Sequence, residues 1–201
     1  MTTPPKPLST KPFAWLLTIG GLIGLIASMA LTLDNLKSLI NPNFVPGCSI
    51  NPIISCGTVM KSASASAFGF PNSWLGLIGF TAVLVVGVSL LAGASYKAWY
   101  WRLFNLGLLL ALVLVHWLML HSLYVIHALC PWCMGVWAVT IPLFWYTTVR
   151  NLRTGDIPTP KPLNRSVDLL RSYKNLVPAL WFLVIIGMIT VKFWYYWRTL
   201  L

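Results

Sequence analysis

The chain alternates between long apolar runs and short polar segments. Five runs are long enough to cross a bilayer, since about 20 mostly apolar residues form a helix that spans the hydrocarbon core. Only the last run contains a charged residue, Lys192. The pattern therefore predicts five membrane-spanning helices, over residues 13–33, 74–95, 103–126, 130–149 and 176–197.

Tyrosine and tryptophan residues gather at the ends of these runs. The aromatic clusters lie at residues 96–101, 145–146 and 193–197. Because amphipathic rings favour the headgroup level of a membrane, these clusters support the predicted helix ends.

The composition indicates an integral membrane protein. Of 201 residues, 58% are hydrophobic and 8% are charged, and the mean hydropathy of +0.78 is far above that of a soluble domain. The first apolar run is too long for a signal-peptide core, so it is predicted to stay as a helix. The chain is expected to be one all-α membrane domain over residues 1–201, with a plain polar connector at 150–175.

The basic residues predict how the helices are oriented. The net charge of +11 could suggest nucleic acid binding, but the basic residues lie in short segments between apolar runs and form no basic, aromatic surface. Cytoplasmic loops retain positive charge. One side of the five helices would carry Lys6, Lys11, Lys97, Arg102, Arg150, Arg153, Lys161, Arg165, Arg171 and Lys174, and the other Lys37, Lys61, Lys192 and Arg198.

This asymmetry predicts a multi-pass protein of the plasma (inner) membrane with its N-terminus in the cytoplasm. All four cysteines would then lie on the outer side, where disulfides form and persist.

The cysteines form two pairs that carry most of the available chemistry. Cys48 and Cys56 lie in the predicted outer loop, residues 34–73, which is long for a compact bundle and therefore indicates a function. Cys130 and Cys133 form a C-x-x-C motif with a proline between them, as at the first turn of a helix. The helix dipole lowers the pKa of thiols at such a position, which suits them to thiol–disulfide exchange. The loop pair could relay electrons to them from a soluble partner.

The four cysteines could also serve structure, metal binding or haem attachment. Two structural disulfides on an exported face would leave the same cysteine count, and this alternative stays open. A zinc site is not predicted, because the spacing fits no common ligand pattern. Covalent haem attachment needs a histidine directly after the second cysteine, where Met134 stands.

Histidines and glycines within the apolar runs are assigned structural roles. His116, His121 and His127 do not share one helical face. His116 is expected to make a local hydrogen bond inside the bundle, and the other two to reach interfacial water. The small residues expected to let helices approach closely are Gly20, Gly24, Gly76 and Gly79.

Three segments occur in a specific order and spacing: "GCSINPIISCGTVMKS" (residues 47–62), "FGFPNSWLG" (68–76) and "LCPWC" (129–133). They include four cysteines, a serine six residues after Cys56 and an Asn-Ser pair that opens the second span. Together they resemble bacterial members of the vitamin K epoxide reductase family, over about residues 13–149.

The resemblance implies a four-helix transmembrane bundle around a quinone, either menaquinone or ubiquinone, plus a fifth transmembrane helix. By position, Cys133 would be the thiol beside the quinone ring and Cys130 would exchange with Cys56. Cys48 would react with the outside partner. The residues that match quinone contacts or stand at their positions are Ser62, Asn72 and Trp137.

The chain departs from the family pattern in three places. Ser49 follows Cys48 where many relatives carry an acidic residue. Trp137 takes the place of a tyrosine that hydrogen-bonds vitamin K in animal relatives, and an indole cannot accept such a bond. Many bacterial relatives carry a fused thioredoxin-like domain, whereas this sequence ends at Leu201. The expected partner is therefore a separate thioredoxin-like protein.

The sequence thus predicts a quinone-dependent thiol oxidase that forms disulfides in exported proteins. Electrons would pass from a reduced thioredoxin-like partner through both cysteine pairs to a membrane quinone. One alternative is a reductase of quinone or its epoxide that uses thiols as reductant, by the same electron path. The other is a non-catalytic membrane protein with two structural disulfides.

Overall fold

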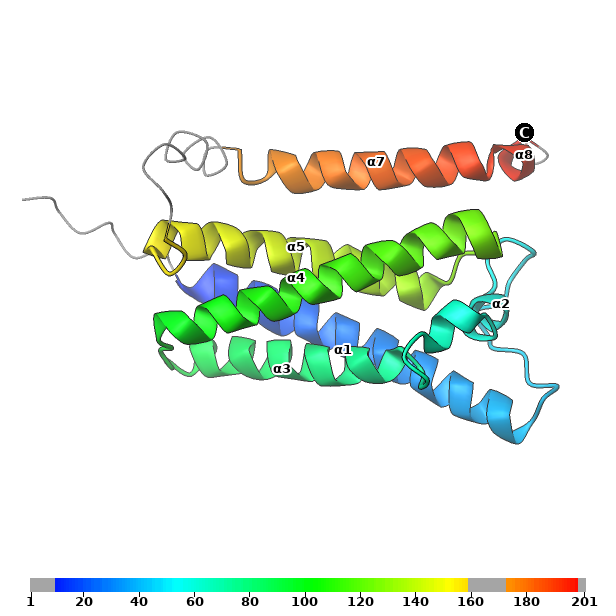
Figure 1. Cartoon of the computed structure of the whole chain (residues 1–201), viewed down its shortest axis with the longest axis horizontal. Helices are drawn as coiled ribbons and strands as arrows, with labels where there is room; N and C mark the ends of the chain where they lie inside the picture. The colour runs from blue at the N-terminus through cyan, green and yellow to red at the C-terminus, as the bar shows by residue number, and fades with distance from the viewer. Residues whose placement is uncertain (1–9, 159–172, 199–201) are drawn as a thin grey trace, which may run out of the picture.

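The computed structural model describes residues 10–158 and 173–198, and its described part is all-helical apart from one isolated bridge. Four helices are long and apolar enough to cross a membrane, and a shorter apolar helix follows them (Figure 1). Of the basic residues used to predict orientation, Lys6, Lys161, Arg165 and Arg171 lie outside the described residues.

The helices are α1 (Thr10–Ile40), α3 (Ser73–Leu91), α4 (Ala98–His121), α5 (Pro131–Thr154), α7 (Leu176–Lys192) and α8 (Trp194–Trp197). The loop that was predicted to face outward holds the short helices α2 (Cys56–Met60) and η1 (Ala63–Ser66), and α4 continues as a π-helix, η2 (Ser122–Ile126).

Several helix ends differ from the predicted ones because local backbone signals decide them. α1 continues to Ile40, since the first residue that disfavours a helix is Asn41, which precedes a proline. The outer loop is correspondingly shorter than predicted and begins at residue 41. α3 ends at Leu91, where Gly93 adopts φ +90° and Ala94 donates back to the carbonyl of Ser89.

The fourth and fifth predicted helices also differ at their ends. Cys130 is not the first residue of α5 but its N-cap, and α5 continues to Thr154 before Gly155 turns the chain with φ +75°. α7 has 17 residues, about 25 Å at 1.5 Å per residue, which is less than the about 30 Å of a hydrocarbon core. Phe193 separates it from α8.

Glycines bring α1 close to its neighbours. A Cβ on Gly21 would lie 2.7 Å from the backbone nitrogen of Leu84 in α3, and one on Gly24 would overlap the ring of Phe80. Gly76, in turn, lies against Ser28. These contacts agree with the packing role expected for the small residues. Gly79 differs, because nothing lies within 4 Å of its Cβ position and it faces a cavity.

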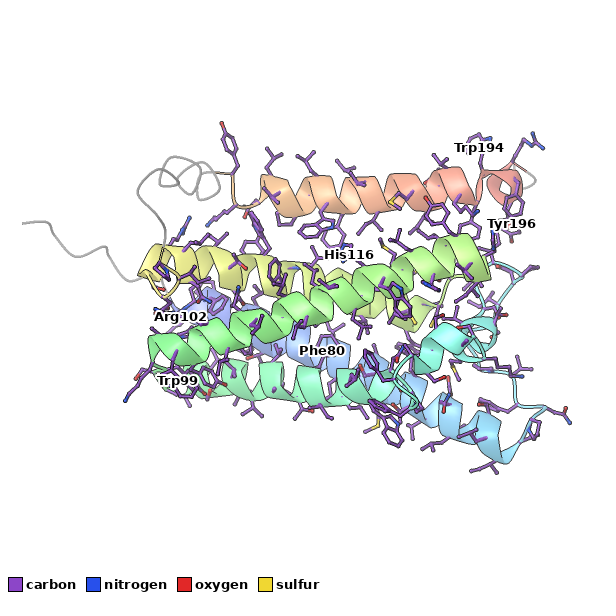
Figure 2. The ribbon with its side chains drawn as sticks, viewed as in Figure 1. Phe80, Trp99, Arg102, His116, Trp194 and Tyr196 are labelled. Atoms are coloured by element: carbon purple, nitrogen blue, oxygen red, sulfur yellow. A yellow bond between two sulfur atoms is a disulfide. The ribbon has the colours of Figure 1, made fainter. Side chains whose placement is uncertain are left out.

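α7 lies along α4 and α5, away from α1 and α3 (Figure 1). His116 lies between α4 and α7 (Figure 2), where its Nε2 accepts a 2.9 Å hydrogen bond from the indole N–H of Trp181. The other ring nitrogen is 2.8 Å from the carbonyl of Leu112, the local bond expected from the sequence. Ile185 of α7 and Phe193, which follows it, are buried in the core that α4 and α5 share. α7 is therefore part of the packed structure.

Replacing Gly21 by alanine should destabilise the protein by about 1–3 kcal/mol, since the added methyl group meets backbone atoms of α3, which cannot rotate away. The matched control is Gly187→Ala, because Gly187 in α7 has nothing within 4 Å of its Cβ position. Thermal unfolding in detergent would measure both. Equal unfolding temperatures for the two variants would contradict this account of the α1–α3 contact.

Candidate active site

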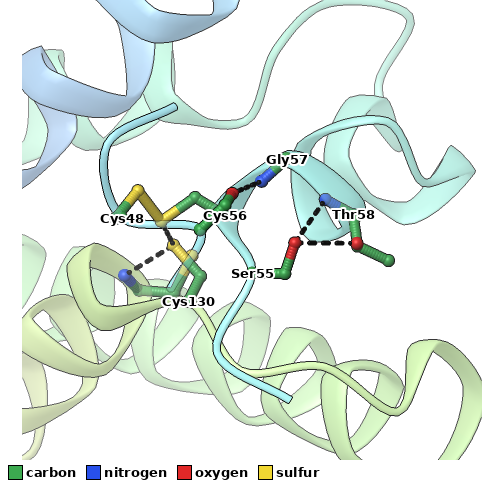
Figure 3. The surroundings of a disulfide bond; sticks show 8 residues. Cys48, Ser55, Cys56, Gly57, Thr58 and Cys130 are labelled. Atoms are coloured by element: carbon green, nitrogen blue, oxygen red, sulfur yellow. Dashed lines mark hydrogen bonds between the residues drawn. A yellow bond between two sulfur atoms is a disulfide. The ribbon is translucent and has the colours of Figure 1, made fainter. Parts of the chain in front are cut away.

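The two cysteine pairs meet where the loop after α1 lies against the start of α5, and Figure 3 shows Cys48, Cys56 and Cys130 there. Cys48 and Cys56 form a disulfide, and Cys130 and Cys133 are free thiols. The sulfur of Cys130 lies 3.3 Å from that of Cys56, although the two residues are 74 positions apart in the chain. The contact between the pairs thus runs through one cysteine of each.

Both contacting cysteines lie where a helix begins. Ser55 caps α2, which Cys56 opens, and the Ser55 hydroxyl accepts a hydrogen bond from the N–H of Thr58. Cys130 caps α5, and its sulfur accepts one from the N–H of Cys133 at 3.4 Å. The Cys130 sulfur thus accepts a hydrogen bond from the first turn of its own helix, whereas the Thr58 N–H in the first turn of α2 is occupied by Ser55.

A short parallel bridge joins the two chain segments just before the cysteines. The N–H of Leu129 donates to the carbonyl of Ile53 at 2.6 Å, and the N–H of Ser55 donates to the carbonyl of Leu129 at 2.9 Å. Ser49 connects the segment that carries Cys48 to α2, because its hydroxyl accepts a 3.1 Å hydrogen bond from the N–H of Gly57. The main chain thus fixes both sides of the sulfur contact.

Burial separates the four cysteines into an inner and an outer set. Cys56 and Cys130 are 0% exposed, whereas Cys48 and Cys133 are half-buried. Cys48 lies beside exposed Gly47 and is open to the outside of the molecule, and Cys133 faces the cavity. A soluble thiol can therefore reach the first pair at Cys48, and a ligand in the cavity can reach the second pair at Cys133.

Hydrogen bonds favour the thiolate form of Cys130. The side chain of Cys133 and the backbone N–H groups of Cys133 and Trp132 lower the pKa of the Cys130 thiol, and their sum outweighs burial, which acts in the opposite direction. A lower pKa gives Cys130 more thiolate at neutral pH, and it also makes this sulfur a better leaving group in exchange.

A cavity of about 1160 Å³ opens beside Cys133, between α1, α3, α4 and α5. Its volume is larger than that of ordinary small-molecule pockets, which is about 300–1,000 Å³, and its wall is mostly apolar. Glycines at 79 and 107 face it from α3 and α4, and neither has an atom within 4 Å of its Cβ position. The four predicted site residues that line this cavity are Ser62, Asn72, Cys133 and Trp137.

The two polar side chains predicted to contact a quinone differ in what they offer. The single hydroxyl hydrogen of Ser62 is directed to the carbonyl of Val59 at 2.6 Å. The Nδ2 of Asn72 donates to the carbonyl of Ser64 at 2.7 Å, while its Oδ1 is buried with no hydrogen-bond partner among the described residues. Asn72 therefore has an unpaired acceptor beside the cavity, and a ligand hydroxyl that displaced the atoms covering it could pair with it.

Trp137 forms part of the cavity wall one helical turn beyond Cys133. Its side chain is 6% exposed and belongs to a core cluster that also contains Ile53 and Leu129 of the bridge and Ile185 of α7. The indole thus connects the wall of the cavity to the core behind the cysteines.

The residues that sequence reasoning missed are those that hold the cysteines by main-chain bonds, namely Ile53, Ser55 and Leu129. Peptide groups are the same in every residue apart from proline, so such bonds leave no mark in the sequence. The one available signal was the Asn-Pro pair at 51–52, since asparagine before proline is typical of a turn.

A comparison with protein-family models gives one match, to the vitamin K epoxide reductase family, over residues 15–148. This range is about two thirds of the chain and contains α3, α4, both cysteine pairs and most of α1 and α5, whereas α7 lies outside it. No curated protein matches the chain. With four apolar membrane-spanning helices, two cysteine pairs in contact and a match over this length, the chain belongs to the vitamin K epoxide reductase family and is an integral membrane oxidoreductase of thiol-dependent quinone chemistry.

Proposed function

We propose that this protein is a thiol oxidase that moves electrons from a reduced thioredoxin-like partner to a membrane quinone and so drives disulfide formation in exported proteins. The observation that carries the proposal is the 3.3 Å contact between the sulfurs of Cys56 and Cys130. Two independent structural disulfides do not require a sulfur of one pair to contact a sulfur of the other, whereas exchange between the pairs does.

The first exchanges open the loop disulfide. A partner thiolate attacks Cys48 Sγ, the Cys48–Cys56 bond breaks, and the partner becomes disulfide-bonded to Cys48 while Cys56 leaves as a thiolate. Cys56 then attacks Cys130 Sγ of an oxidised Cys130–Cys133 pair, so that a Cys56–Cys130 disulfide forms and Cys133 is released as a thiolate. Each exchange breaks one S–S bond and forms another.

Two further exchanges complete the transfer of two electrons. The second thiolate of the partner attacks the partner's own sulfur in the mixed disulfide and releases Cys48. The freed Cys48 thiolate attacks Cys56, which re-forms the Cys48–Cys56 disulfide and releases Cys130. The result is an oxidised partner and a reduced Cys130–Cys133 pair, which is the oxidation state of the four cysteines in this structure.

The cavity fits a quinone as the terminal acceptor. Its apolar wall suits the ring and an isoprenoid tail, and Cys133 and Asn72 contribute polar side chains to that wall. A quinone would supply an acceptor for two electrons and two protons. Trp137 and Ser62 would complete the wall around the ring, and the small residues Gly79 and Gly107 leave room for the tail between α3 and α4.

We place the cysteine end on the outer side of a bacterial inner membrane. The described basic residues Lys97, Arg102, Arg150 and Arg153 gather at the other end, as expected for the cytoplasmic side. An outer position would let Cys48 meet a separate thioredoxin-like protein in an oxidising compartment. A role as a quinone or epoxide reductase uses the same electron path, and the thiol oxidase is favoured because Trp137 stands where animal relatives have the tyrosine that hydrogen-bonds vitamin K.

Cys133→Ala should abolish quinone reduction, since it removes the thiol that faces the cavity. Purified protein would be mixed anaerobically with a water-soluble quinone and a reduced thioredoxin-like protein while quinone absorbance is followed. The variant should still form a mixed disulfide through Cys48. Met134→Ala, which changes an exposed neighbour, is the control and should retain the wild-type rate. Quinone reduction by the Cys133 variant would contradict the role of Cys133 as the thiol that passes electrons to quinone.

Replacing Cys48 and Cys133 together by alanine should yield a Cys56–Cys130 disulfide under mild oxidation, because the two remaining sulfurs are 3.3 Å apart. Differential alkylation and mass spectrometry would detect it. The comparison is Cys48→Ala/Cys130→Ala, in which Cys56 and Cys133 are the remaining thiols. Because Cys133 faces the cavity, a disulfide between these two should form more slowly. Equal rates in the two variants would argue against a relay through Cys56 and Cys130.

Asn72→Leu should weaken binding of a quinol about tenfold more than binding of the matching quinone, because the Asn72 acceptor can pair with a quinol hydroxyl and not with a quinone carbonyl. Inhibition constants of an oxidised and a reduced short-chain quinone would measure the difference. Asn105→Leu removes an amide outside the cavity and serves as the control. If both ligands lose affinity equally in the Asn72 variant, the acceptor role is wrong.

A further inference from the structure

The sulfur contact depends on two peptide segments whose own conformations are held by the side chains of Asn51 and Ser122. The bridge between Ile53, Ser55 and Leu129 forms only if the carbonyl of Ile53 and the N–H of Ser55 face Leu129. Two polar side chains, one on each side of the bridge, fix these directions.

On the loop side, Asn51 folds the chain into a tight turn. Its Oδ1 accepts hydrogen bonds from the N–H groups of Ile53 at 3.0 Å and Ile54 at 2.7 Å. The carbonyl of Ile54 in turn accepts the N–H of Ile50 at 2.8 Å. Because these groups are occupied inside the turn, the carbonyl of Ile53 and the N–H of Ser55 are left to face outward and bond Leu129.

On the helix side, Ser122 holds the connection between α4 and α5. It is 3% exposed, and its hydroxyl donates to the carbonyl of Ala128 while its own carbonyl accepts the N–H of Ala128 at 3.3 Å. His127 makes the required reversal with φ +60°. Both polar groups of Ala128 are thus fixed by one residue, and the next peptide, Leu129, is directed at the loop.

We propose that Asn51 and Ser122 are positioning residues for the exchange between Cys56 and Cys130. They touch neither sulfur. They hold the two strands of the bridge, and the bridge sets how closely the sulfurs approach. The inference rests on the proposed function for its purpose, but the approach of the sulfurs can be measured without quinone or partner.

The measured quantity is the effective concentration of the two thiols in the Cys48→Ala/Cys133→Ala background. In a glutathione buffer, Cys56 and Cys130 react with one oxidised glutathione to give the Cys56–Cys130 disulfide and two reduced glutathiones. The ratio of oxidised to reduced protein gives the effective concentration, which rises when two thiols are held close together.

Asn51→Ala removes two hydrogen bonds and should lower the effective concentration about tenfold, and Ser122→Ala should lower it about fivefold. Asn51→Asp keeps the acceptor and should restore most of the loss. Two matched changes away from the bridge should have no effect. Asn41→Ala removes a similar turn bond earlier in the loop, and Ser89→Ala removes a hydroxyl that donates to the main chain at the other end of the bundle.

A second background separates positioning from general loosening. In Cys130→Ala/Cys133→Ala, Ser122→Ala should leave the effective concentration of the Cys48–Cys56 pair unchanged, since the side-chain hydrogen bond of Ser122 lies on the other side of the bridge, at Ala128. The inference would be overturned if Ser122→Ala lowered the effective concentration of both cysteine pairs equally. It would also be overturned if neither Asn51→Ala nor Ser122→Ala lowered the effective concentration of Cys56 and Cys130. A high effective concentration of Cys56 and Cys130 in the Cys48→Ala/Cys133→Ala background, together with failure of the wild-type protein to reduce quinone, would instead overturn the proposed function and leave the positioning role intact.

Discussion

Two buried sulfurs that belong to different cysteine pairs lie in contact, and the site is built to keep them there. Cys56 and Cys130 are each 0% exposed, and each lies at the start of a helix directly after a bridged peptide segment. Water cannot reach this contact, so exchange between the pairs would compete with few side reactions. The outer ends of the path, Cys48 and Cys133, are the accessible ones, and they face different environments. One chain of four sulfurs thus connects the outside of the protein to an apolar cavity.

The cavity exists because the helices pack unevenly. Glycines let α1 lie directly against α3, and α1 and α4 both pack on α5. The space between α3 and α4 is left open, and small residues such as Gly79 and Gly107 line it instead of filling it. Small residues therefore have two uses in this bundle. Some allow two helix backbones to lie in contact, and others leave the space that forms the cavity.

α7 adds a second layer behind the site. It lies outside the part of the chain that matches the family, yet the Trp181 indole is bonded to His116 and Phe193 is fully buried. Ile185 and Phe193 share a core with Trp137 and Leu129, which contribute to the cavity wall and the bridge. The fifth helix is therefore placed to limit movement of both.

The sequence by itself determined the helical membrane architecture and the chemistry available to it. Apolar length, aromatic ends and the C-x-x-C motif are local signals, since each depends on residues within a few turns of one another. Helix ends were less well determined, as at Ile40, Leu91 and Phe193, because turn and cap geometry decides them. The meeting of Cys56 with Cys130 was implied by family resemblance and not by their spacing.

Only the tertiary structure decided how that meeting is held and what the cavity offers. The bridge is made of peptide groups, which carry no residue signature, and it joins segments about 75 residues apart. The sequence marked Asn72 as a polar contact, but its free group is an acceptor only because the main chain of Ser64 occupies its amide nitrogen. Local sequence sets which helices form, whereas long-range packing sets which of their atoms remain free to react.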